Sequence, residues 1–365
     1  QSKAQTPLMI AIDGEWGLGM RINDGLSYPY QMTLGAVKND LLISEMGIQI
    51  AEQCARLGIN VNFAPTIDVN NEPNNPVIGF RSFGEDPDNV ARKGAAYALA
   101  MQNNGVLPSM KHFPGHGNTV TDSHHALPIV KNSLEEINKI ELLPFKYLID
   151  NGVKGAMVGH LYFPALEPVV NKSSSLSKNI VTDLLRNEMN YDGIIFTDGL
   201  EMKAAYNGID PDSVCLQAIM AGNDIMLLPI DVEASMQIVI DAAKNNPDVK
   251  NRVEESCKKI LRYKYQLGLN NYESQSVERL NNDLHQSRYY NLKQRLYNEA
   301  VTMLVNKKNI LPLKKNNDKK IAVVTFGKDN SISKRLKDNG IENTPFLLNK
   351  DASTEEMKRT AKQLK

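Results

Sequence analysis

Hydrophobic positions along this chain gather in short runs that alternate with longer amphipathic stretches. Six of the runs would be apolar on both faces of an extended chain, which is typical of parallel strands covered by helices. The stretches between them, such as 39–58 and 133–152, have helical periodicity. This alternation predicts an α/β fold. The six predicted strands are 7–15, 59–69, 106–113, 155–161, 193–199 and 223–228.

The succession of strands and helices shows no reversal that would indicate a doubly wound sheet. A closed (β/α)8 barrel of the TIM type needs two strands more than these six. The chain has no initiator methionine, so we expect it to begin partway into a longer protein, with the missing N-terminal barrel units before residue 1. The predicted barrel domain covers residues 1–270.

The pattern changes after Gly268, which is a stop signal near the end of the predicted helix 249–269. Residues 271–295 are polar and poorly periodic, and they predict a linker. A helix followed by an extended segment is expected over 296–313, then a buried strand at 319–327 and a helix at 331–340. This order predicts that 296–365 begins a second α/β domain, which is cut off at Lys365.

Composition excludes several classes of protein. Basic and acidic residues balance at 42 each, and the calculated isoelectric point is near 7.2, so no overall field attracts nucleic acid or an anionic membrane. The three cysteines, Cys54, Cys215 and Cys257, are far apart and form no CxxC, which argues against a disulfide framework and against a thiolate zinc site. No apolar run reaches the roughly 18 residues that cross a bilayer.

Polar residues gather where the predicted strands end. They are Asp13, Glu15, Asp68, Lys111, His112, His160 and Asp198. In barrels of parallel strands this end carries the active site. A single acid here could cap a helix, but a whole ring of charged and imidazole groups would be partly desolvated. The ring therefore predicts a functional site.

Four of the six histidines lie in KHFPGHGNTVTDSHHALP, residues 111–128. The candidate explanations are a metal site, a proton-transfer device and a structural loop. The potential metal ligands His112, His116, Asp122, His124 and His125 are numerous enough for zinc. However, Pro114 and Gly115 break the helix that would align the first two, and no HExxH spacing is present. We therefore expect no metal.

Asp122 and His124 favour the proton-transfer explanation. In an extended loop, side chains two residues apart point the same way, so the carboxylate can hold the imidazole. A carboxylate neighbour fixes the tautomer of an imidazole and favours the protonated form that a general acid needs. The simpler alternative is a loop histidine that only hydrogen-bonds its neighbour. Asp198, which ends a buried strand, is the candidate nucleophile opposite this pair, and the alternative for it is a helix cap.

The motifs KHFPGHG with the following DSH, and LLRNEMNYDGIIFTDGLEM, resemble glycoside hydrolase family 3. The Asp-x-His pair resembles its β-N-acetylglucosaminidase (β-N-acetylhexosaminidase) branch, the NagZ-like enzymes. Weaker matches in the same order are IDGEWGLGMR, FAPTIDVN, IGFRSFG, AGNDIMLL and SCKKILRYKYQLGL. The resemblance covers about residues 8 to 330.

This resemblance implies a (β/α)8 barrel and, in longer members, a following α/β sandwich. It implies a retaining exo-β-N-acetylglucosaminidase that removes terminal GlcNAc from peptidoglycan fragments or chito-oligosaccharides, with no cofactor. Asp198 would be the nucleophile, and His124, held by Asp122, the acid/base. The residues that would bind the terminal sugar are Asp13, Arg21, Arg81, Lys111 and His112. Two-domain relatives favour a periplasmic or secreted location.

Two positions depart from the family pattern. Trp16 stands in a glycine-rich stretch, where its bulk could alter sugar selectivity, and Gly199 stands where a second aspartate is frequent. The alternatives within the family are a β-glucosidase, a β-xylosidase or a glycoside phosphorylase. Outside it, a metal-dependent hydrolase and a non-catalytic sugar-binding module remain open.

Overall fold

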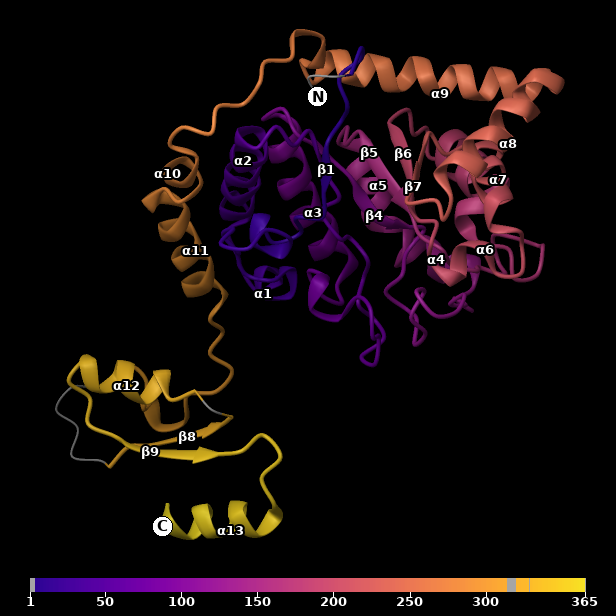
Figure 1. The fold of residues 1–365 in the computed structure, drawn as a ribbon. Helices are drawn as coiled ribbons and strands as arrows, with labels where there is room; N and C mark the ends of the chain where they lie inside the picture. The colour runs from indigo at the N-terminus through magenta and orange to yellow at the C-terminus, as the bar shows by residue number, and fades with distance from the viewer. Residues whose placement is uncertain (1–3, 314–319, 328, 365) are drawn as a thin grey trace. The chain divides into compact units, whose positions relative to one another are not determined.

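The computed structural model describes residues 4–313, 320–327 and 329–364. They divide into two compact units, residues 1–302 and 303–365 (Figure 1). Each unit is described by itself.

The first unit is built on parallel strands (Figure 1). One sheet has the order β1-β2-β3 and the other β4-β5-β6-β7, and every neighbouring pair is parallel. An isolated parallel bridge from Thr66 to Lys111 joins the chain after β2 to β4. The strands are β1 (Ala11–Ile12), β2 (Val61–Asn62), β3 (Leu107–Pro108), β4 (Met110–Phe113), β5 (Gly155–Val158), β6 (Ile194–Gly199) and β7 (Ile225–Leu227).

All six predicted strands are present, although most are shorter than predicted. The prediction 106–113 is split at Ser109, because β3 pairs with β2 while β4 pairs with β5. The strands follow one another in chain order, as right-handed β-α-β connections arrange them. The α/β class with a parallel sheet is confirmed, whereas closure into an eight-stranded barrel stays a prediction.

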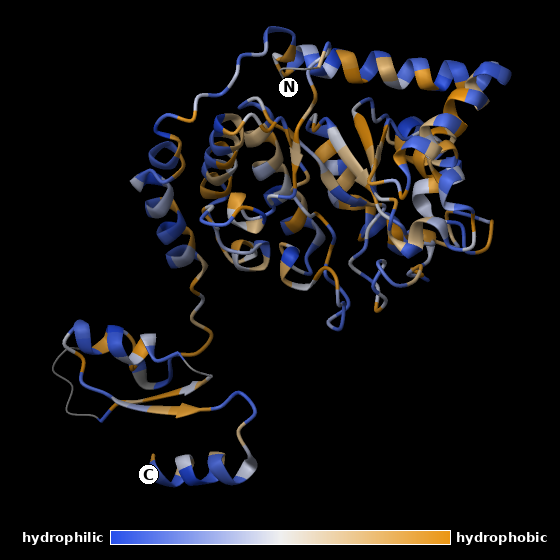
Figure 2. Cartoon of the chain, in the orientation of Figure 1, coloured by the Kyte–Doolittle hydropathy of each residue, from blue (hydrophilic) through white to orange (hydrophobic). Residues whose placement is uncertain are grey.

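Helices occupy the segments between the strands. They are α1 (Gln31–Gly35), α2 (Asp40–Arg56), α3 (Pro87–Gln102), α4 (Leu134–Lys139), α5 (Leu142–Asp150), α6 (Lys203–Tyr206), α7 (Val214–Ala221), α8 (Val232–Asn245) and α9 (Pro247–Gln266). A π-helix covers Asn179–Glu188. The helices carry both hydrophobic and hydrophilic residues, whereas the strands of this unit are mainly hydrophobic (Figure 2).

Local sequence explains where these helices begin. The Asn39 side chain caps α2, and Asp86 caps α3 ahead of Pro87. The helix predicted over 133–152 is interrupted between α4 and α5. Pro144, which has no N–H to donate, fits only in the first turn of a new helix, and that is its place in α5.

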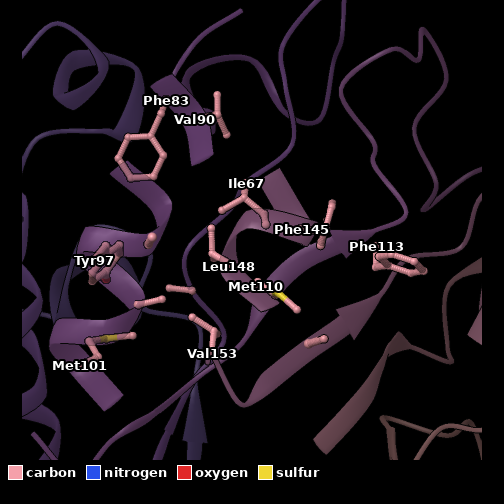
Figure 3. Close-up of a cluster of buried hydrophobic side chains, with 14 of the residues drawn as sticks. Ile67, Phe83, Val90, Tyr97, Met101, Met110, Phe113, Phe145, Leu148 and Val153 are labelled. Atoms are coloured by element: carbon pink, nitrogen blue, oxygen red, sulfur yellow. The ribbon is translucent and has the colours of Figure 1, made fainter. Parts of the chain in front are cut away.

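The core of the first unit lies between the strands and the helices (Figure 3). Phe113 of β4 and Phe145 of α5 meet edge to face, with ring centroids 5.2 Å apart. At the amino ends of the strands, Tyr263 of α9 packs against a second cluster that contains Val61 and Ile194. Because α9 packs at the amino ends, we look for a functional site at the carboxyl ends of the strands.

Residues 271–295 differ from the predicted linker. They contain α10 (Leu280–Leu284) and most of α11 (Ser287–Ala300), and the compact unit ends only after Thr302. Tyr289, Leu292 and Leu296 are buried in the main core at helical spacing. Arg295 adds an ion pair to Glu45 of α2 at 3.0 Å. A narrow apolar stripe in an otherwise polar helix gives weak periodicity, which explains the error.

The second unit again alternates strand and helix. Strand β8 (Ala322–Phe326) pairs in parallel with β9 (Thr344–Leu348). The helices α12 (Ser331–Asp338) and α13 (Thr354–Gln363) follow the two strands. The strand predicted at 319–327 is present as β8 over 322–326, but its residues are exposed or only partly buried, so the predicted burial is wrong. Lys319 lies outside the described residues. The helix predicted at 331–340 is present as α12. Over the parts of the chain that are described, no helix combines the length and the apolar character needed to cross a bilayer.

Candidate active site

A cavity of about 300 Å³ opens where the strands of the first unit end. Its lining residues are Asp13, Glu15, Met20, Arg21, Val77, Arg81, Lys111, His112, His116, Ser123, His124, Asp198 and Met202. Every residue predicted to bind or cleave the substrate lines it, except Asp122, which contacts the lining residue His124. Side chains that are up to 189 positions apart in sequence thus share one space.

A chain of alternating charges forms one wall of the cavity. The Lys111 Nζ lies 2.9 Å from both Asp13 Oδ1 and Glu15 Oε1. Arg81 donates two hydrogen bonds to Glu15, from Nη2 to Oε1 at 2.7 Å and from Nε to Oε2 at 3.0 Å. At the open end, Arg21 Nη2 donates to Asp13 Oδ2 at 3.0 Å.

These contacts keep the wall ionised although it is buried. Burial raises the pKa of the Glu15 carboxyl, but the charges of Lys111 and Arg81 outweigh it, so the pKa falls below its usual value. Burial likewise raises the pKa of Asp13, and Lys111 and Arg21 outweigh that effect. A paired, hydrogen-bonded network of this kind offers donors and acceptors to a polar ligand without reorganisation. Glu15 was predicted as a member of the polar ring, without a role of its own.

Asp68 holds the two histidines of the KHFPGHG motif in place. His112 Nδ1 donates to Asp68 Oδ2 at 2.7 Å, and the backbone N–H of His116 donates to Asp68 Oδ1 at 2.6 Å. Burial raises the pKa of Asp68, and the two histidines outweigh it, so the pKa is lowered. With Nδ1 engaged, His112 turns Nε2 towards Arg81 Nη2, 3.4 Å away. Asp68 is therefore a positioning residue that sequence analysis placed in the ring without a function.

Asp198 ends β6 and is half-buried. The Gly199 N–H donates to its Oδ1 at 2.9 Å. Burial raises the pKa of Asp198, but nearby groups that include the Gly199 N–H and the charge of Lys111 outweigh it and lower the pKa. The side chain is thus a carboxylate at neutral pH, as a nucleophile must be.

His160 supports the backbone that carries Asp198. Its Nε2 donates to the Gly199 carbonyl at 2.9 Å, so Nδ1 accepts from the Ser175 hydroxyl at 2.8 Å. Burial lowers the pKa of His160, which fits this neutral form.

Asp122 and His124 pair on the loop after β4. His124 Nδ1 lies 2.7 Å from Asp122 Oδ1, and the His124 backbone N–H donates to the same oxygen at 2.9 Å. The His124 side chain is 62% exposed, so it can reach a ligand in the cavity through Nε2. The predicted side-by-side arrangement is present; the catalytic role of the pair stays a prediction.

Ser123, between these two residues, anchors their loop. Its side chain is buried, and its hydroxyl lies 3.2 Å from His116 Nε2. Thr119 Oγ1 donates to the His116 carbonyl, so it accepts from His116 Nδ1 at 2.8 Å, and Nε2 is left to accept from Ser123. Burial lowers the pKa of His116 to about 4, which keeps it neutral. The loop is thus tied to the KHFPGHG motif by one buried hydrogen bond.

Three of the four histidines in residues 111–128 each have a different partner. His112 pairs with Asp68, His116 with Thr119 and Ser123, and His124 with Asp122. Among the described residues, no group of three or more histidine, cysteine or acidic side chains is arranged to hold a metal ion. Their concentration in sequence therefore reflects three separate hydrogen-bonding tasks in one loop.

The buried acid Glu141 lies beneath this loop, where a Cβ on Gly115 would contact it. Its Oε1 accepts from Asn132 at 3.2 Å, while its Oε2 and the Oδ1 of Asn71 are buried with no hydrogen-bond partner among the described residues. Burial raises the pKa of Glu141 to about 7, although the nearby Asn71 side chain opposes the shift. The protein therefore carries a buried acid that ionises near neutral pH.

Glu141→Gln is expected to stabilise the protein above pH 7 and to change little near pH 4. A folded-state pKa of about 7, above the reference value of 4.5, means that stability is complete below pH 4.5 and is lost as the pH rises through 7. Glutamine removes this loss because it carries no charge. Urea unfolding should show a gain of about 1 to 3 kcal/mol at pH 8. An equal effect at both pH values would contradict the assignment, and Glu135→Gln on the exposed face of α4 is the control.

Comparison with known proteins identifies the family. The model of the glycosyl hydrolase family 3 N-terminal domain matches residues 1–263. The chain belongs to glycosyl hydrolase family 3. The resemblance predicted from the motifs is therefore confirmed.

Two family 3 relatives are similar over most of this chain. Beta-hexosaminidase A of Pseudoalteromonas piscicida is 37% identical over 340 residues, which is 87% of this chain and 56% of that protein. The solved structure of a family 3 beta-N-acetylglucosaminidase from Paenibacillus sp. str. FPU-7 is 31% identical, with a TM-score of 0.81 over 98% of this chain and 70% of that chain. The chain thus spans little more than half the length of the first relative.

A third protein shares the fold at lower identity. Beta-glucoside phosphorylase BglX has a TM-score of 0.84 over 98% of this chain and 70% of its own, at 22% identity. At this identity the likeness shows a shared fold.

Proposed function

We propose that this family 3 protein is a retaining exo-β-N-acetylglucosaminidase. One observation carries the proposal: Asp198 and the Asp122-paired His124 line the same cavity of about 300 Å³. A carboxylate and an imidazole on opposite sides of a bound sugar are what two-step retention needs. The relatives named beta-hexosaminidase and beta-N-acetylglucosaminidase support the choice of sugar.

In the first step, an oxygen of Asp198 attacks the anomeric carbon while the bond from that carbon to the leaving oxygen breaks. His124 gives its Nε2 proton to the leaving oxygen and becomes neutral. In the second step, neutral His124 takes a proton from water, the water oxygen attacks the anomeric carbon, and the Asp198 carboxylate leaves. Asp122, at 2.7 Å from Nδ1, stabilises the imidazolium before the first step and after the second.

The terminal sugar would be held by the charged wall. Carboxylate oxygens of Asp13 accept from sugar hydroxyls, and Arg81 and Lys111 offer donors. His112, whose Nδ1–H is taken by Asp68, offers Nε2 as an acceptor. Arg21 closes the outer side through Asp13. Because Lys111 and Glu15 are almost fully buried, the inner end of the cavity is closed, which favours exo cleavage of a terminal residue. We further propose that the strands belong to a (β/α)8-type barrel and that the substrates are chito-oligosaccharides or peptidoglycan fragments.

Phosphorolysis is the second candidate reaction. After proton donation, the imidazole of His124 is neutral, whereas a carboxylic acid would become an anion. Less negative charge beside the glycosyl-enzyme lowers the repulsion of phosphate, so phosphate can compete with water as the acceptor.

The test compares aryl β-glycosides of GlcNAc, glucose and xylose, each with and without inorganic phosphate. We expect the GlcNAc substrate to be preferred by about 100-fold or more in kcat/KM. Formation of GlcNAc 1-phosphate would show that the reaction is phosphorolysis and not hydrolysis. A preference for the glucose or xylose substrate would contradict the assignment of GlcNAc as the terminal sugar. Loss of activity with a chelator and its return with zinc would favour the metal-dependent alternative.

A further inference from the structure

A second cavity, of about 480 Å³, lies at the amino ends of β6 and β7. Gly193 comes directly before β6 and Asp224 directly before β7, and each of them contacts a cation of this cavity. Asp198 of the candidate active site stands at the other end of β6. The charged residues that line the second cavity are Arg186, Arg252, Glu255, Lys258, Lys259 and Arg262. We call it the basic cavity.

The cations of the basic cavity come from two elements. Arg186 belongs to the π-helix, and the other four belong to α9. On α9, Arg252, Lys259 and Arg262 follow one another at intervals of seven and three residues, so they share one face of the helix. Arg186 Nη2 and Arg252 Nη2 both donate to the Gly222 carbonyl, at 3.4 and 3.3 Å. The two elements therefore converge, and π-helical turns, which are rare, often occur at functional sites.

The buried carboxylate of Asp224 accounts for part of this positive charge. It pairs with Arg186, with Arg252 at 2.8 Å and with Lys259 at 3.5 Å. It also accepts from the Ile195 N–H at 3.0 Å, so it ties β6, the start of β7 and α9 together. This structural role explains the guanidinium groups that contact Asp224 closely. One carboxylate does not neutralise three cations.

The other cations are weakly paired. Glu255 pairs with Arg252 at 3.0 Å, but its side chain is mostly exposed. Lys258 Nζ lies 3.6 Å from a carboxylate oxygen of Glu254, and both side chains are exposed to screening by water. In the part of the chain that is described, the Arg262 side chain forms no hydrogen bond or ion pair. The five cations of the basic cavity thus exceed its two carboxylates by three.

Lys259 responds to this excess of positive charge. Burial lowers the pKa of its ammonium group, and the attraction of Asp224 does not compensate because Arg186 and Arg252 repel the ammonium group. The repulsion is a cost to the folded protein. An anion bound in the basic cavity would relieve it.

The donors favour phosphate over carboxylate as the ligand. Guanidinium and ammonium groups both bind phosphate. A tetrahedral phosphate offers oxygens in several directions to donors from two elements, whereas a carboxylate presents its two oxygens in one plane. A single phosphate ester carries about 1.5 to 2 negative charges near pH 7. An excess of three positive charges therefore suits a diphosphate group better.

We infer that the basic cavity is a binding site for the diphosphate group of a soluble molecule, held by Lys258, Lys259 and Arg262 beside the Asp224 network. The site lies at the opposite end of β6 from Asp198 and takes no part in bond cleavage. The inference goes beyond the proposed function and does not depend on which sugar the protein cleaves.

The test is a calorimetric titration of the chain with inorganic pyrophosphate at constant ionic strength. We expect saturable binding of one equivalent. Lys258→Ala and Arg262→Ala should each weaken it by about 5- to 20-fold, because each removes a charge-assisted contact. Both side chains are exposed, so both variants should fold, which circular dichroism checks. Absence of pyrophosphate binding, or unchanged affinity in both folded variants, would overturn the inference.

Lys250→Ala is the matched control, because Lys250 is an exposed cation of α9 that does not line the basic cavity. It should leave the affinity unchanged, and a loss equal to that of Arg262→Ala would reveal unspecific attraction and reject the site.

Two further titrations test the class of ligand. Citrate should bind at least about 10-fold more weakly than pyrophosphate, and equal binding would refute the choice of phosphate. Vesicles of phosphatidylcholine and phosphatidic acid present phosphate at a lipid surface, and we expect no cosedimentation with them. Cosedimentation that Arg262→Ala abolishes would refute the choice of a soluble ligand.

Discussion

Asp198→Asn is expected to lower kcat on an aryl β-GlcNAc substrate by roughly 10⁴-fold or more, because an amide cannot form the covalent intermediate. The fold should be unaffected, since the amide oxygen can still accept the hydrogen bond from the Gly199 N–H. A slow 2-fluoro or 5-fluoro glycosyl substrate should label the wild-type chain on the peptide that contains Asp198. The measurement is steady-state kinetics with mass mapping of the labelled peptide.

Two variants make this result specific. Asp192→Asn is the matched control, because Asp192 lies just before the start of β6 and pairs with Lys154 at the surface; it should retain full activity. His124→Ala should lose activity on poor leaving groups but retain much of it on leaving groups that depart without a proton. A label on another residue, or an active Asp198→Asn enzyme, would refute the assigned nucleophile.

Lys111→Met is expected to have the largest effect on stability, a loss of about 3 to 5 kcal/mol in the free energy of unfolding. The ammonium group is buried and lies 2.9 Å from carboxylate oxygens of both Asp13 and Glu15. Removing it leaves Glu15, which is 0% exposed, with Arg81 as the one cation that still pairs with it among the described residues. Removal of one member of a buried charge network costs far more than the network itself contributes.

Lys154→Met is the matched control for that substitution. Lys154 pairs with Asp192 at 2.7 Å, but the two side chains are 38% and 76% exposed. Its loss should cost less than about 1 kcal/mol because water screens the pair. Urea unfolding measures the free energy of unfolding of both variants. Equal losses would show that burial does not determine how much Lys111 contributes to stability. Adding Glu15→Gln to Lys111→Met should recover part of the stability, since it removes the unpaired charge.

The predicted fold and the structure agree most closely where the hydrophobic pattern is strong. All six predicted strands lie near observed strands, and one of the six is split into β3 and β4, because a strand covered on both faces is mainly apolar. The prediction is wrong at α11, which was assigned in part to a linker. There, three buried residues, Tyr289, Leu292 and Leu296, suffice to dock the helix.

The candidate site could be predicted as a set of residues but not as a geometry. Chain order and strand ends placed Asp13, Lys111 and Asp198 at one edge, and local spacing alone placed Asp122 beside His124. The sequence could not show that Glu15 pairs with Arg81, 66 positions away, or that Asp68 fixes His112. In the sequence, these polar residues could equally be helix caps or surface charges.

The sequence by itself determined the fold class, the family and the neighbours in the chain that share a task, because these depend on local periodicity and on short motifs. Only the tertiary structure decided which charges meet, which of them are buried, and that cations of the π-helix and of α9 line one cavity. The physical reason is that desolvation and charge pairing depend on distances between residues far apart in the chain. Chain packing, not local sequence, sets these distances.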